Sequence, residues 1–188
     1  MRSTGLQLNK PESRFECKRC GACCKNRDVK LTLDDIFRLS EFLDMDPDSF
    51  FNKYCVEVSK NDDSLALPYL QRDGERCHFL EDNLCQAHFA KPSACINLPS
   101  AIFGSIEDVR AQMPPICSIQ NSRIETNDAE NDRRRRNYMT AMMLTTIYYS
   151  KFGTFKYEYA KPFIYRILLF RRNRDQIYNM TGAGVASN

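Results

Sequence analysis

Residues 15–24 read FECKRCGACC, and this stretch decides how the rest of the sequence is interpreted. It places Cys17, Cys20, Cys23 and Cys24 within eight residues. Four thiols so close together cannot all point into one apolar core, because the local backbone directs neighbouring side chains apart. Two-residue gaps bring sulfur atoms to one side of a turn, as soft metal ions and iron–sulfur clusters require. The stretch therefore predicts a metal centre.

The other cysteines support this interpretation. Cys55 stands alone, and we expect it on an amphipathic helix as apolar filler rather than as a ligand. An odd total of nine cysteines, two of them adjacent, makes a poor disulfide framework. We predict that eight cysteines bind the metal or cofactor: Cys17, Cys20, Cys23, Cys24, Cys77, Cys85, Cys95 and Cys117.

The N-terminal sequence has no apolar stretch of the kind that forms a signal peptide. We therefore expect a cytoplasmic protein, because a reducing compartment leaves thiols free to bind metal. No uninterrupted apolar run is long enough to cross a bilayer, so we expect no transmembrane segment. With 188 residues, 43% of them hydrophobic, the chain can bury one ordinary core.

Charge is distributed unevenly along the chain. Residues 131–188 hold eleven Lys or Arg and three Asp or Glu, whereas residues 1–130 hold sixteen and twenty-one. The arginines at 133–136, together with Arg171, Arg172 and Arg174, can form a basic surface for an acidic protein or for nucleic acid. A solvated helix end paired with Glu130 and Asp132 explains them equally well. We favour a protein partner, either a redox partner or a modified substrate, over nucleic acid.

The predicted fold class is mostly α with a small β-hairpin, an irregular α+β arrangement organised by metal. In it, C-terminal helices pack on a cysteine-rich N-terminal region. We expect a flexible lead-in at 1–14 and a cysteine-cluster metal-binding region at 15–120. A basic helical region at 121–180 and a disordered tail at 181–188 complete the chain.

Local signals predict two helices in the first third. Thr32 can cap a helix on which Ile36, Leu39 and Leu43 share one face. The Asp-Pro-Asp sequence at 46–48 suits the start of a second helix, with proline at its first position.

The middle of the chain predicts a hairpin and loops. Asp-Gly at 73–74 lies between apolar runs and is a hairpin signal, which would carry Cys77 on the return strand. A turn at 82–83 leads to Cys85. The proline-containing stretch 97–118 is expected to be rich in loops.

The last third is predicted to be helical. Thr126 or Asn127 can cap a helix that runs to about Ser150. A second helical pattern follows Gly153, and Pro162 is expected to divide it or to begin its second piece. One face of the first helix is apolar and broad: Tyr138, Ala141, Met142, Thr145, Tyr148 and Tyr149.

The spacing allows two kinds of metal centre. A CxxCxxC run reaches three corners of a cubane, with a remote cysteine as the fourth ligand. Cys17, Cys20, Cys23 and one distant cysteine could thus hold a [4Fe-4S] cluster, and Cys24 with three later cysteines could hold a second. Structural zinc is the alternative, because zinc sites built from four cysteines use similar pairs. The later thiols form no second CxxC pair, and this favours a cluster.

Two histidines lie close to cysteines in the sequence. His78 follows Cys77 directly, and His88 comes three residues after Cys85. Neutral imidazole suits zinc and some iron centres. Because eight thiols are available, we favour positions outside the ligand set for both histidines.

FECKRCGACC resembles the motif of the YkgJ-type CxxCxxCC cysteine-cluster family, described as zinc- or iron-chelating domains. The resemblance continues through KLTLDDIFRLSEFL and through CHFLEDNLCQAHFAKPSACINLP, and it covers roughly residues 15–118. Departures include Lys91 where arginine is usual and His88 where an aromatic residue is common. The resemblance implies metal binding by the eight cysteines.

Flagellin lysine N-methylases carry a motif similar to this one and are thought to hold an iron–sulfur cluster. Three hypotheses follow for function. The first is a [4Fe-4S] protein, with one cluster or two, acting as a redox (electron-transfer) or metal-handling module. The second is an iron–sulfur-dependent protein-modifying enzyme such as a methylase, and the third is a structural zinc-binding interaction protein. No GxGxxG motif is present, which argues against a Rossmann-type methyl-donor site.

Overall fold

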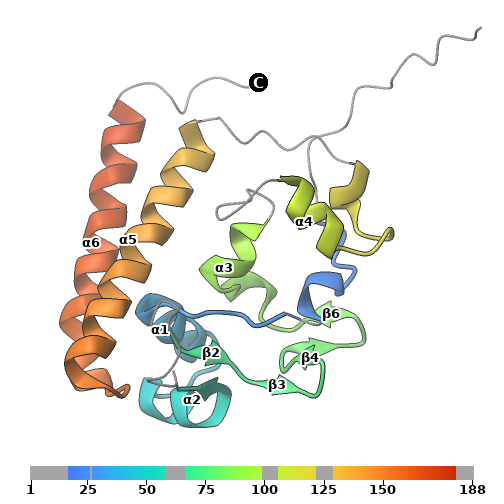
Figure 1. Ribbon diagram of the computed structural model, residues 1–188. Coiled ribbons are helices and arrows are strands. Elements are labelled where there is room, and N and C mark those ends of the chain that lie inside the picture. Colours follow the sequence, from blue (N-terminus) through green and yellow to red (C-terminus); the bar gives the residue numbers. More distant parts are fainter. Residues whose placement is uncertain (1–16, 26, 58–66, 99–105, 122–128, 181–188) are drawn as a thin grey trace, which may run out of the picture.

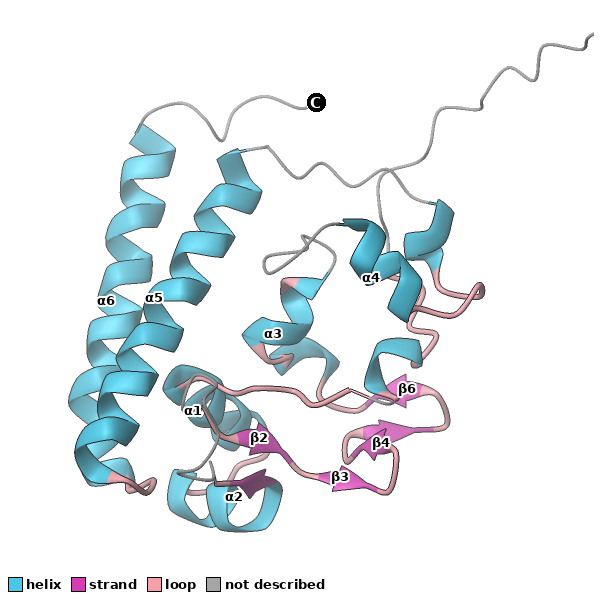
Figure 2. Ribbon diagram, viewed as in Figure 1, coloured by secondary structure: helices cyan, strands magenta, loops and turns pink. Residues whose placement is uncertain are grey.

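The computed structural model of the chain describes residues 17–25, 27–57, 67–98, 106–121 and 129–180. Within these ranges the structure is mostly helical, with three two-stranded antiparallel ladders (Figure 1, Figure 2). The C-terminal helices pack on the helix that follows the cysteine loop. The predicted fold class is therefore confirmed, although the structure has three ladders where one hairpin was expected.

The helices and strands are short except at the C-terminal end. The α-helices are α1 (Leu33–Phe42), α2 (Pro47–Tyr54), α3 (Ser93–Ile96), α4 (Ile106–Gln112), α5 (Ala129–Phe152) and α6 (Tyr157–Met180). The 3-10 helices are η1 (Ala22–Cys24), η2 (His88–Ala90) and η4 (Ser118–Asn121). The strands are β1 (Cys55–Val56), β2 (Tyr69–Leu70), β3 (Arg72–Asp73), β4 (Arg76–Cys77), β5 (Leu80–Glu81) and β6 (Leu84–Cys85).

The first two helices begin where the sequence predicts. The backbone N–H of Thr32 donates to the Asp35 carboxylate at 3.1 Å, and this bond fixes the start of α1. Asp46 accepts hydrogen bonds from the backbone N–H groups of Asp48 and Ser49, both at 3.0 Å, and so caps α2. Ile36 and Leu39 are fully buried on the predicted face of α1.

The two long helices α5 and α6 lie side by side and cover α1 (Figure 1). Thr145 ties α5 to the start of α1, because its Oγ1 accepts from the backbone N–H of Leu33 at 3.0 Å. The Tyr148 hydroxyl accepts from the N–H of Lys156 at 2.9 Å and thereby closes the turn between α5 and α6. The predicted apolar face of α5 is buried: Tyr138, Ala141, Met142, Thr145, Tyr148 and Tyr149.

The prediction that Pro162 would divide the last helical region was wrong. α6 continues through Pro162, which is its sixth residue. A proline in a helix removes one backbone hydrogen bond. Ala160, Ile164 and Ile167 are buried around this position, and their packing stabilises the uninterrupted helix.

The expectation of a loop-rich segment at 97–118 was also wrong in part, because it contains α4. Glu107 and Asp108 lie in the first turn of α4, where carboxylates suit the helix dipole. Gln120 donates from its side chain to the carbonyl of Arg110 at 2.8 Å. Gln120 therefore satisfies a backbone carbonyl in the last turn of α4, although it lies ten positions after Arg110. Local sequence signals do not reveal such a contact.

The ladders deliver cysteines to one end of the molecule. The predicted hairpin is present as β3–β4, with Cys77 on the return strand. The turn at Asp82 and Asn83 has φ of 46° and 62°, respectively, the conformation of a tight hairpin turn, and it joins β5 to β6. Cys55 lies in strand β1 opposite Leu70, so its predicted place on a helix was wrong.

Several expectations concern residues outside the described ranges. They are the lead-in at 1–14, the tail at 181–188 and the helix caps at Thr126 and Asn127. Among the helices that the structure describes, none combines the length and the apolar character needed to cross a bilayer.

Candidate metal centre

The cysteine loop is shaped by Gly21 and held against the third ladder. Gly21 has φ of +71°, and a Cβ there would lie 3.1 Å from Leu80 Cδ1 and 3.2 Å from the carbonyl oxygen of Asn83. The backbone of Lys25 pairs in an isolated antiparallel β-bridge with Arg76, the first residue of β4. The Lys25 ammonium donates to the Asn83 side chain at 3.1 Å. These contacts bring η1 next to the strands that carry Cys77 and Cys85.

The thiols of the loop interact with cysteines far along the chain. The Cys24 thiol hydrogen-bonds to Cys23 and to Cys85. Cys117 is hydrogen-bonded to Cys20, across 97 residues of sequence. Electrostatic interactions couple these groups to the remaining candidates, so seven of the eight predicted cysteines interact with one another: Cys20, Cys23, Cys24, Cys77, Cys85, Cys95 and Cys117.

The seven thiols come from five separate segments: the loop with η1, strands β4 and β6, helix α3, and the residue before η4. Cys17, the eighth candidate, is exposed at the start of the described chain. All the cysteines are free thiols. In the part of the chain that is described, no three His, Cys, Asp or Glu side chains are already placed so that they could hold a metal ion together.

Two of the thiols favour the thiolate form. The Cys24 hydrogen bond lowers the pKa of Cys23 to about 6, with help from the positive charges of Arg27 and Lys91. The pKa of Cys85 is lowered to about 7, again mainly by the Cys24 hydrogen bond and also by Lys91. Both shifts favour the thiolate, which is the form that binds metal.

The other thiols favour the protonated form. The pKa of Cys24 is raised because its proton is held by hydrogen bonds to Cys23 and Cys85. Burial raises the pKa of Cys95 to about 12 and also raises the pKa values of Cys77 and Cys117. These protons must leave when the thiols bind a metal ion.

Cys55 and His78 have other surroundings. Cys55 packs against the hydrophobic core, and burial raises its pKa to about 12. His78 places Nδ1 3.1 Å from a carboxylate oxygen of Asp73, and its ring packs against Tyr54 and Phe79. These contacts agree with the interpretation that neither residue belongs to the ligand set.

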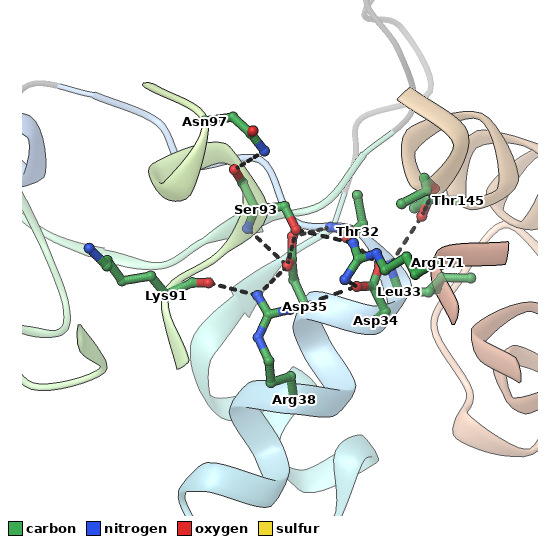
Figure 3. A network of polar contacts seen from close by, with 11 residues as sticks. Thr32, Leu33, Asp34, Asp35, Arg38, Lys91, Ser93, Asn97, Thr145 and Arg171 are labelled. Carbon is green, nitrogen blue, oxygen red and sulfur yellow. Dashed lines mark hydrogen bonds and ion pairs between the residues drawn. The ribbon is translucent and has the colours of Figure 1, made fainter. Parts of the chain in front are cut away.

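A buried polar network fixes helix α3, which carries Cys95 (Figure 3). The carboxylate of Asp35 accepts from the backbone N–H of Ser93 at 2.9 Å and from its hydroxyl at 2.8 Å. Arg38 donates to the same carboxylate at 2.7 Å and to the carbonyl of Lys91 at 2.6 Å. Asp35 and Arg38 thus join α1 to both ends of the turn that leads into α3.

The same network reaches the C-terminal helices. Arg171 of α6 forms an ion pair of 2.7 Å with Asp34, whose side chain is buried. Burial and the neighbouring Asp35 raise the pKa of Asp34, while Arg171 and Thr32 oppose this shift. No local sequence signal reveals these contacts of Asp35 and Asp34, because the partners lie 58 and 137 positions away.

The arginine-rich start of α5 is partly paired, since Arg136 lies 3.3 Å from Asp132. Arg171, which the sequence also placed among the basic residues, is turned toward Asp34. These two pairs favour the solvated helix end over a continuous basic surface.

Comparison with known proteins gives one family. The CxxCxxCC family model, described as "Putative zinc- or iron-chelating domain", matches residues 16–133, which is well over half of the chain. No curated protein and no solved structure matches the chain.

Proposed function

Because the chain belongs to the CxxCxxCC family of zinc- or iron-chelating domains, we propose that it binds a [4Fe-4S] cluster through its cysteines and acts as a redox or metal-handling module. The observation that carries this proposal is the interaction of seven thiols from five segments of the chain. Core cysteines pack singly among apolar side chains, as Cys55 does. A mutually interacting group of thiols has the donor chemistry of a soft metal centre.

The contacts support two ligand sets. Cys117 pairs with Cys20 and is therefore the remote ligand that completes a set with Cys17 and Cys23. The second set combines Cys24 with Cys77 and Cys85, which interact with it, and with Cys95, which interacts with both of those later thiols. Each set contains four thiols, which suits a [4Fe-4S] cluster or a tetrahedral zinc ion.

Metal binding would proceed from the thiols that favour the thiolate form. Cys23 and Cys85 offer one thiolate to each ligand set. The protonated members, such as Cys24 and Cys95, bind once a metal ion displaces their protons, so loading releases protons to the solvent. Because the ladders have two residues per strand, the centre would also contribute to the stability of this end of the molecule.

Zinc is the second candidate, because the family description covers both metals. Two closed sites of four cysteines each would use the same eight thiols and would leave no open coordination position. Such sites would make the protein a scaffold that presents the C-terminal helices to a protein partner. We place the protein in the cytoplasm in either case, since its free thiols need a reducing compartment.

Anaerobic purification tests the proposal. The visible spectrum is recorded together with the contents of iron, sulfide and zinc. A [4Fe-4S] cluster predicts a broad band near ~400 nm that bleaches with dithionite. Colourless protein with stoichiometric zinc would contradict the cluster and support the zinc alternative. Metal-free protein that is folded and indifferent to chelators would contradict both forms of the proposal.

Cysteine variants test the two ligand sets. Cys117→Ser should lose the first centre and keep the second, whereas Cys85→Ser should do the reverse. Cys55→Ser is the matched control, and it should keep the full metal content because Cys55 packs against the core. A Cys55 variant that loses metal, or a Cys117 variant that keeps all of it, would refute the assignment.

A further inference from the structure

Arg27 lies between the cysteine loop and helix α3. Its Nη2 donates to the carbonyl of Ala94 at 3.1 Å, directly before Cys95. Its Nη1 is buried and has no hydrogen-bond partner among the described residues. A buried donor on a charged group is costly when it is unpaired, so the position needs an explanation.

The charge of Arg27 faces thiols from two segments. After the Cys24 hydrogen bond, it helps to lower the pKa of Cys23, in the loop, and it partly opposes the rise that burial causes in the pKa of Cys95, in α3. Lys91 also acts on Cys23 and on Cys85, but Arg27 differs from Lys91 in having a buried N–H with no hydrogen-bond partner among the described residues. No carboxylate among the described residues forms an ion pair with Arg27. The partly buried guanidinium therefore has no carboxylate partner in this part of the chain, and an anion is expected beside it.

A bound metal centre would supply that anion. A divalent ion held by four thiolates carries a net negative charge, and so does a cluster held by four thiolates. Sulfur ligands with such excess charge accept hydrogen bonds, and outer hydrogen bonds of this kind tune the affinity and the reduction potential of the centre.

We propose that Arg27 is the cation that compensates the thiolate centre, with its free Nη1–H donating to a metal-bound cysteine sulfur at the boundary of the two ligand sets. This inference rests on the proposed metal binding and adds a positioning residue outside the cysteines. Arg27 binds no metal itself. It holds α3 through Ala94 and offsets negative charge on Cys23 and Cys95.

The experiment measures zinc affinity in reduced, metal-free protein by competition with a coloured chelator under anaerobic conditions. Arg27→Gln should weaken zinc binding by about 10- to 100-fold, the usual effect of removing an outer-shell partner. Arg27→Lys keeps the charge but not the planar fork, so its loss should be smaller. Arg136→Gln is the matched control, because Arg136 pairs with Asp132 on α5.

Thermal unfolding separates charge compensation from packing. Without metal, Arg27→Gln should lose little stability, because the loss of the hydrogen bond to Ala94 is offset by removal of the buried, unpaired Nη1–H. With zinc, the variant should show a smaller rise in Tm than wild type. Equal loss of stability in both states would mean that Arg27 serves packing alone, and it would overturn the inference. If the glutamine variant does not fold, Arg27→Met is measured in the same way. A methionine variant that also fails to fold would mean that Arg27 serves packing alone, and it would overturn the inference.

The failure of this inference differs from that of the proposed function. Wild-type protein that binds no zinc or iron would contradict metal binding itself. Wild-type protein that binds zinc, with an Arg27→Gln variant of equal affinity, would overturn only the role of Arg27.

Discussion

At the scale of single residues, the backbone at Gly21 controls where the loop thiols lie. Its φ of +71° belongs to the left-handed region, which side chains with a Cβ adopt at a cost. A Cβ there would also crowd Leu80 and the backbone of Asn83. The loop therefore approaches the β5–β6 turn closely enough for Cys24 to contact Cys85.

We expect Gly21→Ala to lower both stability and metal content. The backbone conformation alone should cost about 1–2 kcal/mol, and the crowding of Asn83 should move the loop away from β6. Gly74→Ala is the matched control, since Gly74 has φ of +63° but open space around it. Thermal unfolding and metal analysis of the loaded variants check the prediction. It would be wrong if both variants kept full metal content.

At the scale of elements, helix α3 shows how a short piece of structure is held in place. Its four residues are too few to form a stable helix by themselves. The Asp35 carboxylate binds its first residue, Ser93, while Arg38 holds the preceding turn. Cys95 thus owes its position to α1 rather than to its own neighbours in the sequence.

Asp35→Asn should destabilise the protein by about 1–3 kcal/mol, because it removes the charge that accepts hydrogen bonds from Arg38 and from the N–H of Ser93. Arg38 would keep only its 3.8 Å ion pair with Asp34. Asp28→Asn removes an exposed ion pair with Arg72 and should cost no more than about 1 kcal/mol. Urea unfolding of both variants measures the difference. Since α3 carries Cys95, the Asp35 variant should also bind zinc more weakly. Equal stability of the two variants would show that the network does not hold α3.

At the scale of the whole molecule, the C-terminal helices complete a core that the metal-binding region shares. The family match ends at residue 133, whereas α5 and α6 extend to Met180. Leu33, Ile36 and Leu39 of α1 are fully buried. Arg171 and Thr145 reach the first turn of α1 from these two helices. The region that precedes α5 is thus covered by α5 and α6, which lie almost entirely beyond the end of the family match.

A chain that ends at residue 128 should therefore fail to fold cooperatively without metal. Each large apolar side chain that becomes exposed would remove about 1.5–3 kcal/mol of burial energy. Circular dichroism during heating, with and without zinc, measures the effect. Magnesium serves as the control cation, because it prefers oxygen ligands. A sharp, metal-independent transition in the shortened chain would show that residues before α5 form an independent domain.

Features that depend on neighbouring residues could be predicted from the sequence. These are the thiol spacing of the cysteine loop, the starts of α1 and α2, the Asp-Gly turn before Cys77 and the buried face of α5. Each depends on a cap, a turn or a periodicity within a few positions, where the chain connectivity already limits the geometry.

The contacts between distant groups could not be predicted, because they depend on how the elements pack in three dimensions. The tertiary structure paired Cys117 with Cys20, Asp35 with Ser93 and Asp34 with Arg171, and it placed Arg27 beside two thiols. It also kept α6 intact through Pro162, where packing outweighs the loss of one backbone bond. Such contacts follow from how whole elements pack. A short stretch of sequence shows which donors and acceptors need partners, but it does not identify the distant residues that will pair with them.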